Sequence, residues 1–209
     1  MNLPNKITLT RIFMIPVFIA VFYCGLLNVW CYLASAVVFL AAALTDALDG
    51  HIARSRHLVT DLGKFLDPIA DKVLVMAAFI IMLTIPTAFV VYPFGQYGLI
   101  VAGVLISFVI ARELIVSGFR IIAAGKNVVL AADKLGKIKT VSQDISIALM
   151  LVAMSLLQYG LAGEIVAYAG LVVFVFSSLM TVISGMNYLI KNRVVLKDNK
   201  TEQSEGENS

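Results

Sequence analysis

Charged residues are scarce in this sequence and are absent from four long stretches. Only 14% of the 209 residues are Asp, Glu, Lys or Arg, whereas 60% are hydrophobic. The stretches without a charge cover 12–45, 73–111, 145–163 and 165–190. This composition excludes a soluble domain, which needs more polar surface. It predicts an all-α integral membrane protein, because a membrane-spanning helix needs about 20 predominantly apolar residues.

Cysteine and histidine are too few to indicate a disulfide framework or a metal site with soft ligands. Cys24 and Cys31 flank a break in the first apolar stretch. We expect two separate thiols there, with a disulfide as the alternative. His51 and His57 have no second soft ligand at metal-binding spacing, so we expect both to be polar residues of the membrane interface. No small-residue cleavage site follows a short apolar segment, so we expect the first helix to be retained.

Breaks near 25–28 and 86–95 divide the apolar stretches into six expected helices. We place transmembrane helices at roughly 8–26, 31–55, 64–86, 97–121, 138–158 and 164–190. Residues 1–197 then form one membrane domain, and residues 198–209 form a polar, disordered tail. The three connections expected on one side of the membrane contain no Lys or Arg. The positive-inside rule therefore predicts that both termini are cytoplasmic.

Four aspartates lie at the polar ends of two neighbouring expected helices. Asp46 and Asp49 are three residues apart, and Asp67 and Asp71 are four apart, so each pair shares a helix face. A hairpin of the two helices brings all four together, where the carboxylates repel strongly unless a cation lies between them. Oxygen ligands suit Mg²⁺ or Mn²⁺. We therefore predict metal ligands at these four positions, on the cytoplasmic side.

Residues around these aspartates are suited to a phosphate-containing ligand. Gly50 removes a side chain beside the carboxylates, so that a ligand can approach the backbone closely. Ala53 keeps the next helical turn open, and Arg54 offers a planar fork for a phosphate. Thr60 is a candidate contact for a base or ribose, with ordinary turn chemistry as the alternative.

The stretch from Asp46 to Asp71 resembles the signature of the CDP-alcohol phosphatidyltransferases. That signature is D-x-x-D-G-x-x-A-R, eight residues, then G-x-x-x-D-x-x-x-D, and every fixed position is filled here. The matching residues are Asp46, Asp49, Gly50, Ala53, Arg54, Gly63, Asp67 and Asp71. The resemblance implies that an alcohol attacks the lipid-attached phosphorus of a CDP-lipid and that CMP leaves. It also implies Asp71 as the general base and metal contact, two metal ions, and a homodimer.

The same resemblance implies a set of residues that hold the CDP-lipid. The start of the chain places Asn5, Thr8 and Arg11 on one helical face, as in many members of the family. A helix cap with interfacial charges is the alternative for this segment. The implied contacts are Asn5, Thr8, Asp49, Gly50, Ala53, Arg54, Thr60 and Gly63.

Cations beyond the aspartate motif point to a phosphorylated acceptor. Arg112 and Glu113 lie in apolar surroundings, where ionised residues are usually functional, although an ion pair is the alternative. Arg120 is eight residues from Arg112 and nearly shares its face. Lys137 and Lys139 open the fifth helix, where positive-inside anchoring is the alternative role for the two lysines. We predict that Arg112, Arg120, Lys137 and Lys139 bind the acceptor phosphate. We expect Lys72, in contrast, to extend to the membrane surface, with neutralisation of charge in the site as the alternative.

Two short matches favour one branch of the family. Ala-Arg112-Glu113 and Gly-Lys137-x-Lys139-Thr-x-x-Gln resemble the phosphatidylglycerophosphate synthase branch. This resemblance implies glycerol 3-phosphate as the acceptor and phosphatidylglycerol phosphate as the product, made in a bacterial cell membrane. Inositol phosphate, serine and phosphatidylglycerol are alternative acceptors.

Two other classes of membrane protein also use intramembrane carboxylates. A UbiA-type prenyltransferase carries them on separate helix pairs and lacks this spacing. A cation transporter places its site near the middle of the membrane, whereas these aspartates lie at one end. We expect no nucleic-acid partner.

Overall fold

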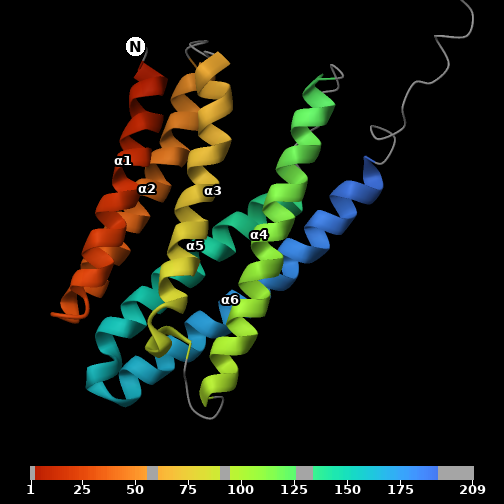
Figure 1. Cartoon of the computed structure of the whole chain (residues 1–209). Coiled ribbons are helices and arrows are strands. Elements are labelled where there is room, and N and C mark those ends of the chain that lie inside the picture. The colour runs from red at the N-terminus through yellow and green to blue at the C-terminus, as the bar shows by residue number, and fades with distance from the viewer. Residues whose placement is uncertain (1–2, 56–60, 90–94, 126–133, 193–209) are drawn as a thin grey trace, which may run out of the picture.

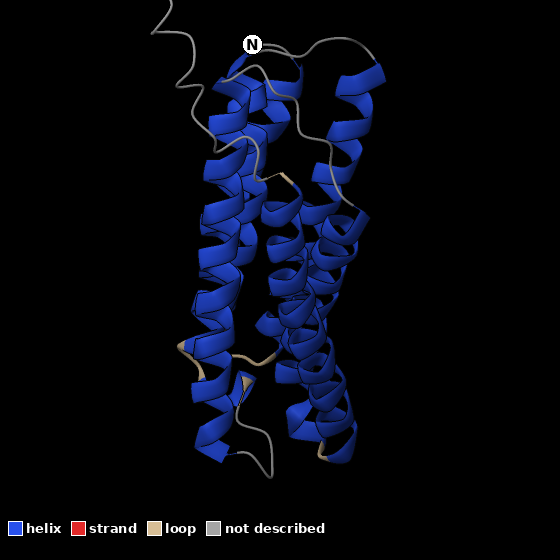
Figure 2. Ribbon diagram, turned by 90° about the vertical axis from the view of Figure 1, so that its right-hand side faces the viewer, coloured by secondary structure: helices blue, strands red, loops and turns tan. Residues whose placement is uncertain are grey.

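The computed structural model describes residues 3–55, 61–89, 95–125 and 134–192, and within these ranges it does not describe the side chains of 3–9, 46–55 and 61–71 or of a few isolated positions. The described residues form six α-helices and two short 3₁₀ turns and contain no strand (Figures 1 and 2). The α-helices are α1 (Leu3–Cys24), α2 (Trp30–Ser55), α3 (Asp61–Leu83), α4 (Gly95–Gly125), α5 (Lys134–Leu156) and α6 (Leu161–Lys191). The prediction of an all-helical protein is therefore confirmed.

Three of these helices are long and apolar enough to cross a membrane. The qualifying segments are Tyr97–Ile121, Gly136–Tyr159 and Leu161–Lys191. Shorter apolar segments lie in the first three helices, at Thr10–Cys24, Trp30–Thr45 and Lys72–Leu83. Many large apolar side chains on the outside of the bundle are exposed, including Leu27 at 92% and Phe108 at 59%. Such a surface is compatible with lipid rather than water, and the chain is a membrane protein.

The break between α1 and α2 depends on a glycine. Gly25 is buried, and a Cβ atom at this position would lie 2.3 Å from the Tyr32 ring. The missing side chain therefore lets the ring pack against the turn, where Tyr32 also contacts Phe22 edge-on at 5.4 Å between centroids. These contacts fold α2 back along α1.

The main hydrophobic core lies between α1, α2, α3 and α5. Phe18, Phe22 and Phe39 are fully buried in it, and the Phe18 and Phe39 ring centroids are 5.8 Å apart. Phe174 brings α6 into the same core through its contact with Phe79 at 5.4 Å. Aromatic rings bury large apolar areas and favour such tilted contacts, so these residues fix how the helices pack.

The last three helices complete the bundle. α5 and α6 pack along each other and are joined by the 3₁₀ turn Leu157–Tyr159 and by Gly160, whose φ of 66° favours glycine. α4 packs mainly on α6 and also on α3. Figure 1 shows the start of α1, the end of α2, the start of α3 and the end of α4 at the same end of the bundle. The candidate site residues lie towards this end.

Candidate active site

The aspartate motif lies on two adjoining helix ends. Asp46 and Asp49 belong to the last three turns of α2, and Asp67 and Asp71 belong to the first three turns of α3. The two helices run in opposite directions and contact each other. The fold therefore places the two halves of the motif at one end of the bundle. The side chains of all four aspartates lie outside the described residues, and the side chains that are described contain no cluster of three or more His, Cys, Asp or Glu.

Most of the residues predicted to hold a CDP-lipid share this end of the fold. Gly50, Ala53 and Arg54 lie in the last two turns of α2, and Gly63 lies in the first turn of α3. Asn5 and Thr8 lie in the first two turns of α1, which packs against both helices. Their side chains, as well as Thr60 itself, lie outside the described residues.

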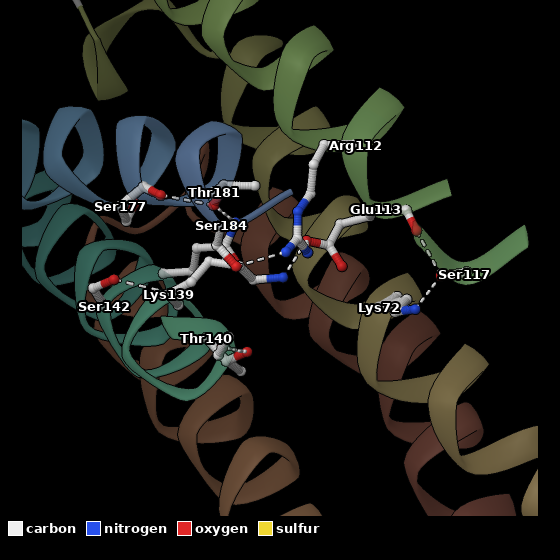
Figure 3. Close-up of polar contacts among 12 residues, drawn as sticks. Lys72, Arg112, Glu113, Ser117, Lys139, Thr140, Ser142, Ser177, Thr181 and Ser184 are labelled. Carbon is white, nitrogen blue, oxygen red and sulfur yellow. Dashed lines mark hydrogen bonds and ion pairs between the residues drawn. The ribbon is translucent and has the colours of Figure 1, made fainter. Parts of the chain in front are cut away.

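A buried carboxylate, Glu113, joins two of the predicted acceptor-binding cations. Arg112 Nη1 donates to Glu113 Oε1 at 2.9 Å, and Lys139 Nζ donates to the same oxygen (Figure 3). Glu113 and Lys139 are each only 6% exposed. Two cations, one from α4 and one from α5, thus share one carboxylate. The ion pair between Arg112 and Glu113, which the sequence left as the alternative, is present. Lys139 of α5 joins the same carboxylate.

Arg112 is also held by α6. Its Nη2 donates to Ser184 Oγ at 2.9 Å. A Cβ atom at Gly185 would lie 2.6 Å from Arg112 Cγ and 2.8 Å from its Nε, so the arginine lies directly on the α6 backbone. The small residues Ser184 and Gly185 thus let α4 and α6 pack closely. Among the described residues Arg112 Nε has no hydrogen-bond partner although it is buried.

Arg112, Glu113 and Lys139 form a cluster, here called the Glu113 cluster. Lys72 connects it to the helix that carries Asp67 and Asp71. Its Nζ donates to Ser117 Oγ on α4, and the Ser117 hydroxyl donates to the backbone carbonyl of Glu113. Figure 3 shows Lys72 and Ser117 facing each other between α3 and α4. The expectation that Lys72 extends to the membrane surface is wrong, because α4 packs on α3 and offers the ammonium a hydroxyl acceptor.

The other two predicted cations lie differently. Arg120 is exposed, and its guanidinium carbon lies 5.3 Å from the centre of the Tyr188 ring, with Nε 3.3 Å from the Tyr188 hydroxyl. Phe119 contacts the same ring edge-on. Lys137 is exposed near the start of α5. The structure therefore brings Arg112 and Lys139 together at Glu113, whereas Arg120 packs on Tyr188 of α6.

A small cavity lies beside the Glu113 cluster. Its polar lining consists of Lys72, Glu113, Lys139, Thr140 and Gln143. Apolar residues of α3 and α4 complete its wall, namely Val75, Met76, Phe79 and Val109. Two of the polar groups are cations and one is an anion, so the lining of this cavity carries a net positive charge.

The amide at the α5 side of this cavity is fixed by α6. Gln143 Nε2 donates to Thr181 Oγ1 at 3.2 Å, and Thr181 Oγ1 donates to the backbone carbonyl of Ser177 at 2.7 Å. Sequence reasoning did not assign roles to Thr181 or Ser117. In the sequence, each of them is a small hydroxyl residue in a largely apolar helix, and no motif marks it.

Comparison with known proteins gives this arrangement a context. A sequence model of the family described as CDP-alcohol phosphatidyltransferase matches residues 1–194. A CDP-diacylglycerol–glycerol-3-phosphate 3-phosphatidyltransferase of Bacillus subtilis (strain 168) is 42% identical over 208 residues, which cover 94% of this chain and 97% of that protein. The protein of the same name from Escherichia coli (strain K12) is 33% identical over 207 residues, which cover 94% of this chain and 98% of that protein.

Proposed function

The chain belongs to the CDP-alcohol phosphatidyltransferase family, and we propose that it transfers a phosphatidyl group from CDP-diacylglycerol to sn-glycerol 3-phosphate. The products are phosphatidylglycerol phosphate and CMP. The observation that carries this proposal is the complete aspartate motif on the adjoining ends of α2 and α3. The names of curated relatives that align over nearly their whole length support the choice of donor and acceptor.

The proposed reaction breaks the phosphoanhydride bond of the CDP-lipid and forms a phosphate ester. A free hydroxyl oxygen of glycerol 3-phosphate attacks the phosphorus attached to diacylglycerol, and the bond from that phosphorus to the CMP oxygen breaks. Asp71 takes the proton that the hydroxyl loses, as its place in the motif implies. A carboxylate near the reacting hydroxyl is a suitable general base, and such catalysis contributes roughly 10²–10⁴-fold to the rate.

The residues of the motif fit a divalent metal. Four aspartates within two helix ends form an oxygen-only ligand set, which suits Mg²⁺ or Mn²⁺, and the family is generally metal-dependent. We assign the metal-binding role to Asp46, Asp49, Asp67 and Asp71, with two ions. When bound, the metal neutralises charge on the pyrophosphate of the CDP-lipid.

The nucleotide end of the CDP-lipid is assigned to the residues around the motif. Arg54 binds a phosphate through its planar fork, and Gly50 and Ala53 leave room for the ligand. Thr60 is the last residue of the connection between α2 and α3, Gly63 lies in the first turn of α3, and Asn5 and Thr8 lie in the first two turns of α1. The shared location of these helix ends supports the assignment.

The acceptor phosphate is assigned to the cations beside the motif. Arg112 and Lys139 offer charge-assisted hydrogen bonds near Glu113, and Lys72 joins their cluster to α3. Arg120 and Lys137 lie on exposed positions nearer the helix ends, where they attract the anion as it enters.

The proposed site requires a defined topology. We assign six membrane spans to α1–α6 and place both termini and the aspartate motif on the cytoplasmic side of the cell membrane. The absence of Lys and Arg from the three opposite connections supports this orientation. We also assign residues 1–197 to the membrane domain, residues 198–209 to a polar tail, and the active form to a homodimer.

Saturation curves for Arg112→Ala test the acceptor assignment. We expect the KM for glycerol 3-phosphate to rise about 10- to 150-fold, because the loss of a charged hydrogen bond is worth roughly 1.5–3 kcal/mol. The KM for CDP-diacylglycerol should change little. Lys191→Ala, which removes an exposed cation from the last turn of α6, is the control. An equal rise in both KM values, or none, contradicts the assignment.

A further inference from the structure

Glu113 is a buried anion in a helix that is otherwise apolar over most of its length. It is 6% exposed and belongs to the segment Tyr97–Ile121, which is apolar enough to span a membrane. A charged residue inside a spanning helix is energetically costly, and such residues usually have a functional role. Replacing a buried ion pair by apolar residues of similar volume is often neutral or stabilising. Packing alone therefore does not account for a glutamate at this position.

The two cations that share Glu113 depend on it to different degrees. Arg112 has further support from Ser184 and from the Gly185 backbone of α6. The hydrogen-bond partner of Lys139 Nζ among the described side chains is Glu113. A lysine side chain is a flexible four-carbon stem with a point charge at its end. The direction of the Lys139 ammonium is consequently set by Glu113.

We propose that Glu113 is a positioning residue for the acceptor: it holds the Lys139 ammonium beside the Arg112 guanidinium so that both cations are in place when a phosphate group arrives. The inference rests on the proposed function, because it assumes that these cations bind the acceptor phosphate. Glu113 acts through Lys139 and does not itself contact the substrate.

Charge balance explains why an anion is suited to this position. Without Glu113 the buried Lys139 ammonium and the part-buried Arg112 guanidinium repel each other where solvent screens their charges little. With Glu113 present, the three side chains together carry one net positive charge. The cluster therefore still attracts a phosphate. The Ser117 hydroxyl, which bonds to the Glu113 carbonyl and to Lys72, ties this part of α4 to the helix of Asp67 and Asp71. Preorganised groups of this kind reduce the ordering that binding requires.

Steady-state kinetics of Glu113→Gln separate this role from a general structural one. The substitution keeps the shape of the side chain but removes its charge. We expect the KM for glycerol 3-phosphate to rise about tenfold or more, while kcat and the KM for CDP-diacylglycerol stay within about twofold. Glu164→Gln, at an exposed position in the first turn of α6, is the matched control. A fall in kcat with an unchanged acceptor KM overturns the proposal.

The Glu113→Asp variant provides a second, more conservative measurement. Aspartate keeps the charge but withdraws the carboxylate by one methylene group, so we expect a smaller rise in the acceptor KM than for Glu113→Gln. If the glutamine variant does not fold, the aspartate variant carries the test alone. An acceptor KM equal to that of the unsubstituted chain then overturns the proposal.

A double-mutant comparison tests whether Glu113 acts through Lys139. Independent effects on KM multiply to within about twofold. We expect instead that adding Glu113→Gln to Lys139→Met leaves the acceptor KM within about twofold of that of Lys139→Met alone. Full multiplication of the two effects overturns the positioning role but leaves the proposed function intact. If Lys139→Met and Arg112→Ala both leave the acceptor KM unchanged, the acceptor assignment itself fails.

Discussion

The side chains of the Glu113 cluster form hydrogen bonds and ion pairs that connect three helices. Arg112 and Lys139 both donate to Glu113, and Arg112 also donates to Ser184 on α6. Removing one partner of a buried charge pair usually costs about 3–5 kcal/mol, because the other charge stays buried. Substitutions in this cluster therefore need a stability measurement beside every kinetic one.

The aspartates have a separate role, which a single substitution distinguishes. We expect Asp71→Asn to lower turnover by roughly 10²-fold or more, because asparagine keeps the size of the side chain but cannot accept the proton. Binding of CDP-diacylglycerol should be largely retained, since three carboxylates remain to hold the metal. The measurement is CMP release together with equilibrium binding of the CDP-lipid.

Asp198→Asn, in the segment beyond the family match at 1–194, is the matched control for this experiment. Turnover of Asp71→Asn within about tenfold of that of the unsubstituted chain removes Asp71 as the general base.

The sequence alone identified the polar residues in the apolar helices, but it did not predict which of them contact one another. Glu113 and Lys139 are 26 residues apart, and Lys72 and Ser117 are 45 apart. Such pairs depend on how α3, α4 and α5 pack, which local spacing does not determine. The wrong expectation for Lys72 has the same origin, since only the neighbouring helix supplies its hydroxyl partner.

At the scale of the elements, charge-free stretches and their breaks predicted all six α-helices that the structure describes. The helix boundaries were less well predicted. α1 begins at Leu3 rather than near residue 8, and α4 continues to Gly125 rather than ending near 121. Hydropathy marks the apolar part of a helix, whereas backbone hydrogen bonds continue into the polar interface. Pro4 fits this extension, because proline is tolerated in the first turn of a helix.

The contact between α4 and α6 gives a prediction at this scale. We expect Gly185→Ala to raise the KM for glycerol 3-phosphate about tenfold, because the new methyl group overlaps the Arg112 side chain. Overpacking of this kind costs typically 1–3 kcal/mol, and here it displaces the guanidinium from its position beside Glu113. The measurement is an acceptor saturation curve.

Gly103→Ala is the matched control on α4, since a Cβ atom there meets nothing within 4 Å. Equal acceptor KM values for the two variants contradict the view that close approach of α6 fixes Arg112.

At the scale of the whole molecule, the arrangement of the helices determines which substrates can meet. The ends of α2 and α3 that carry the motif lie at the same end of the bundle as the start of α1. A site at a membrane boundary is open both to a lipid donor and to a water-soluble acceptor. The proposed cytoplasmic orientation follows from the distribution of Lys and Arg and is open to direct measurement.

The two native cysteines test this orientation. Both are free thiols, and Cys24 is exposed at the end of α1, opposite the motif. We expect a membrane-impermeant maleimide to label the chain in intact cells and expect Cys24→Ser to lose most of that label. Labelling that appears only after the membrane is permeabilised reverses the proposed topology.

The most direct measurement of the central claim is CMP release by the purified chain in detergent micelles with CDP-diacylglycerol and Mg²⁺. We expect release on addition of glycerol 3-phosphate, with one phosphatidylglycerol phosphate formed for each CMP. Unphosphorylated glycerol should give none, and EDTA should stop the reaction. Release that persists after exhaustive chelation contradicts the metal assignment. Preferential transfer to inositol phosphate, serine or phosphatidylglycerol contradicts the proposed acceptor, and absence of CMP release with every acceptor contradicts the account as a whole.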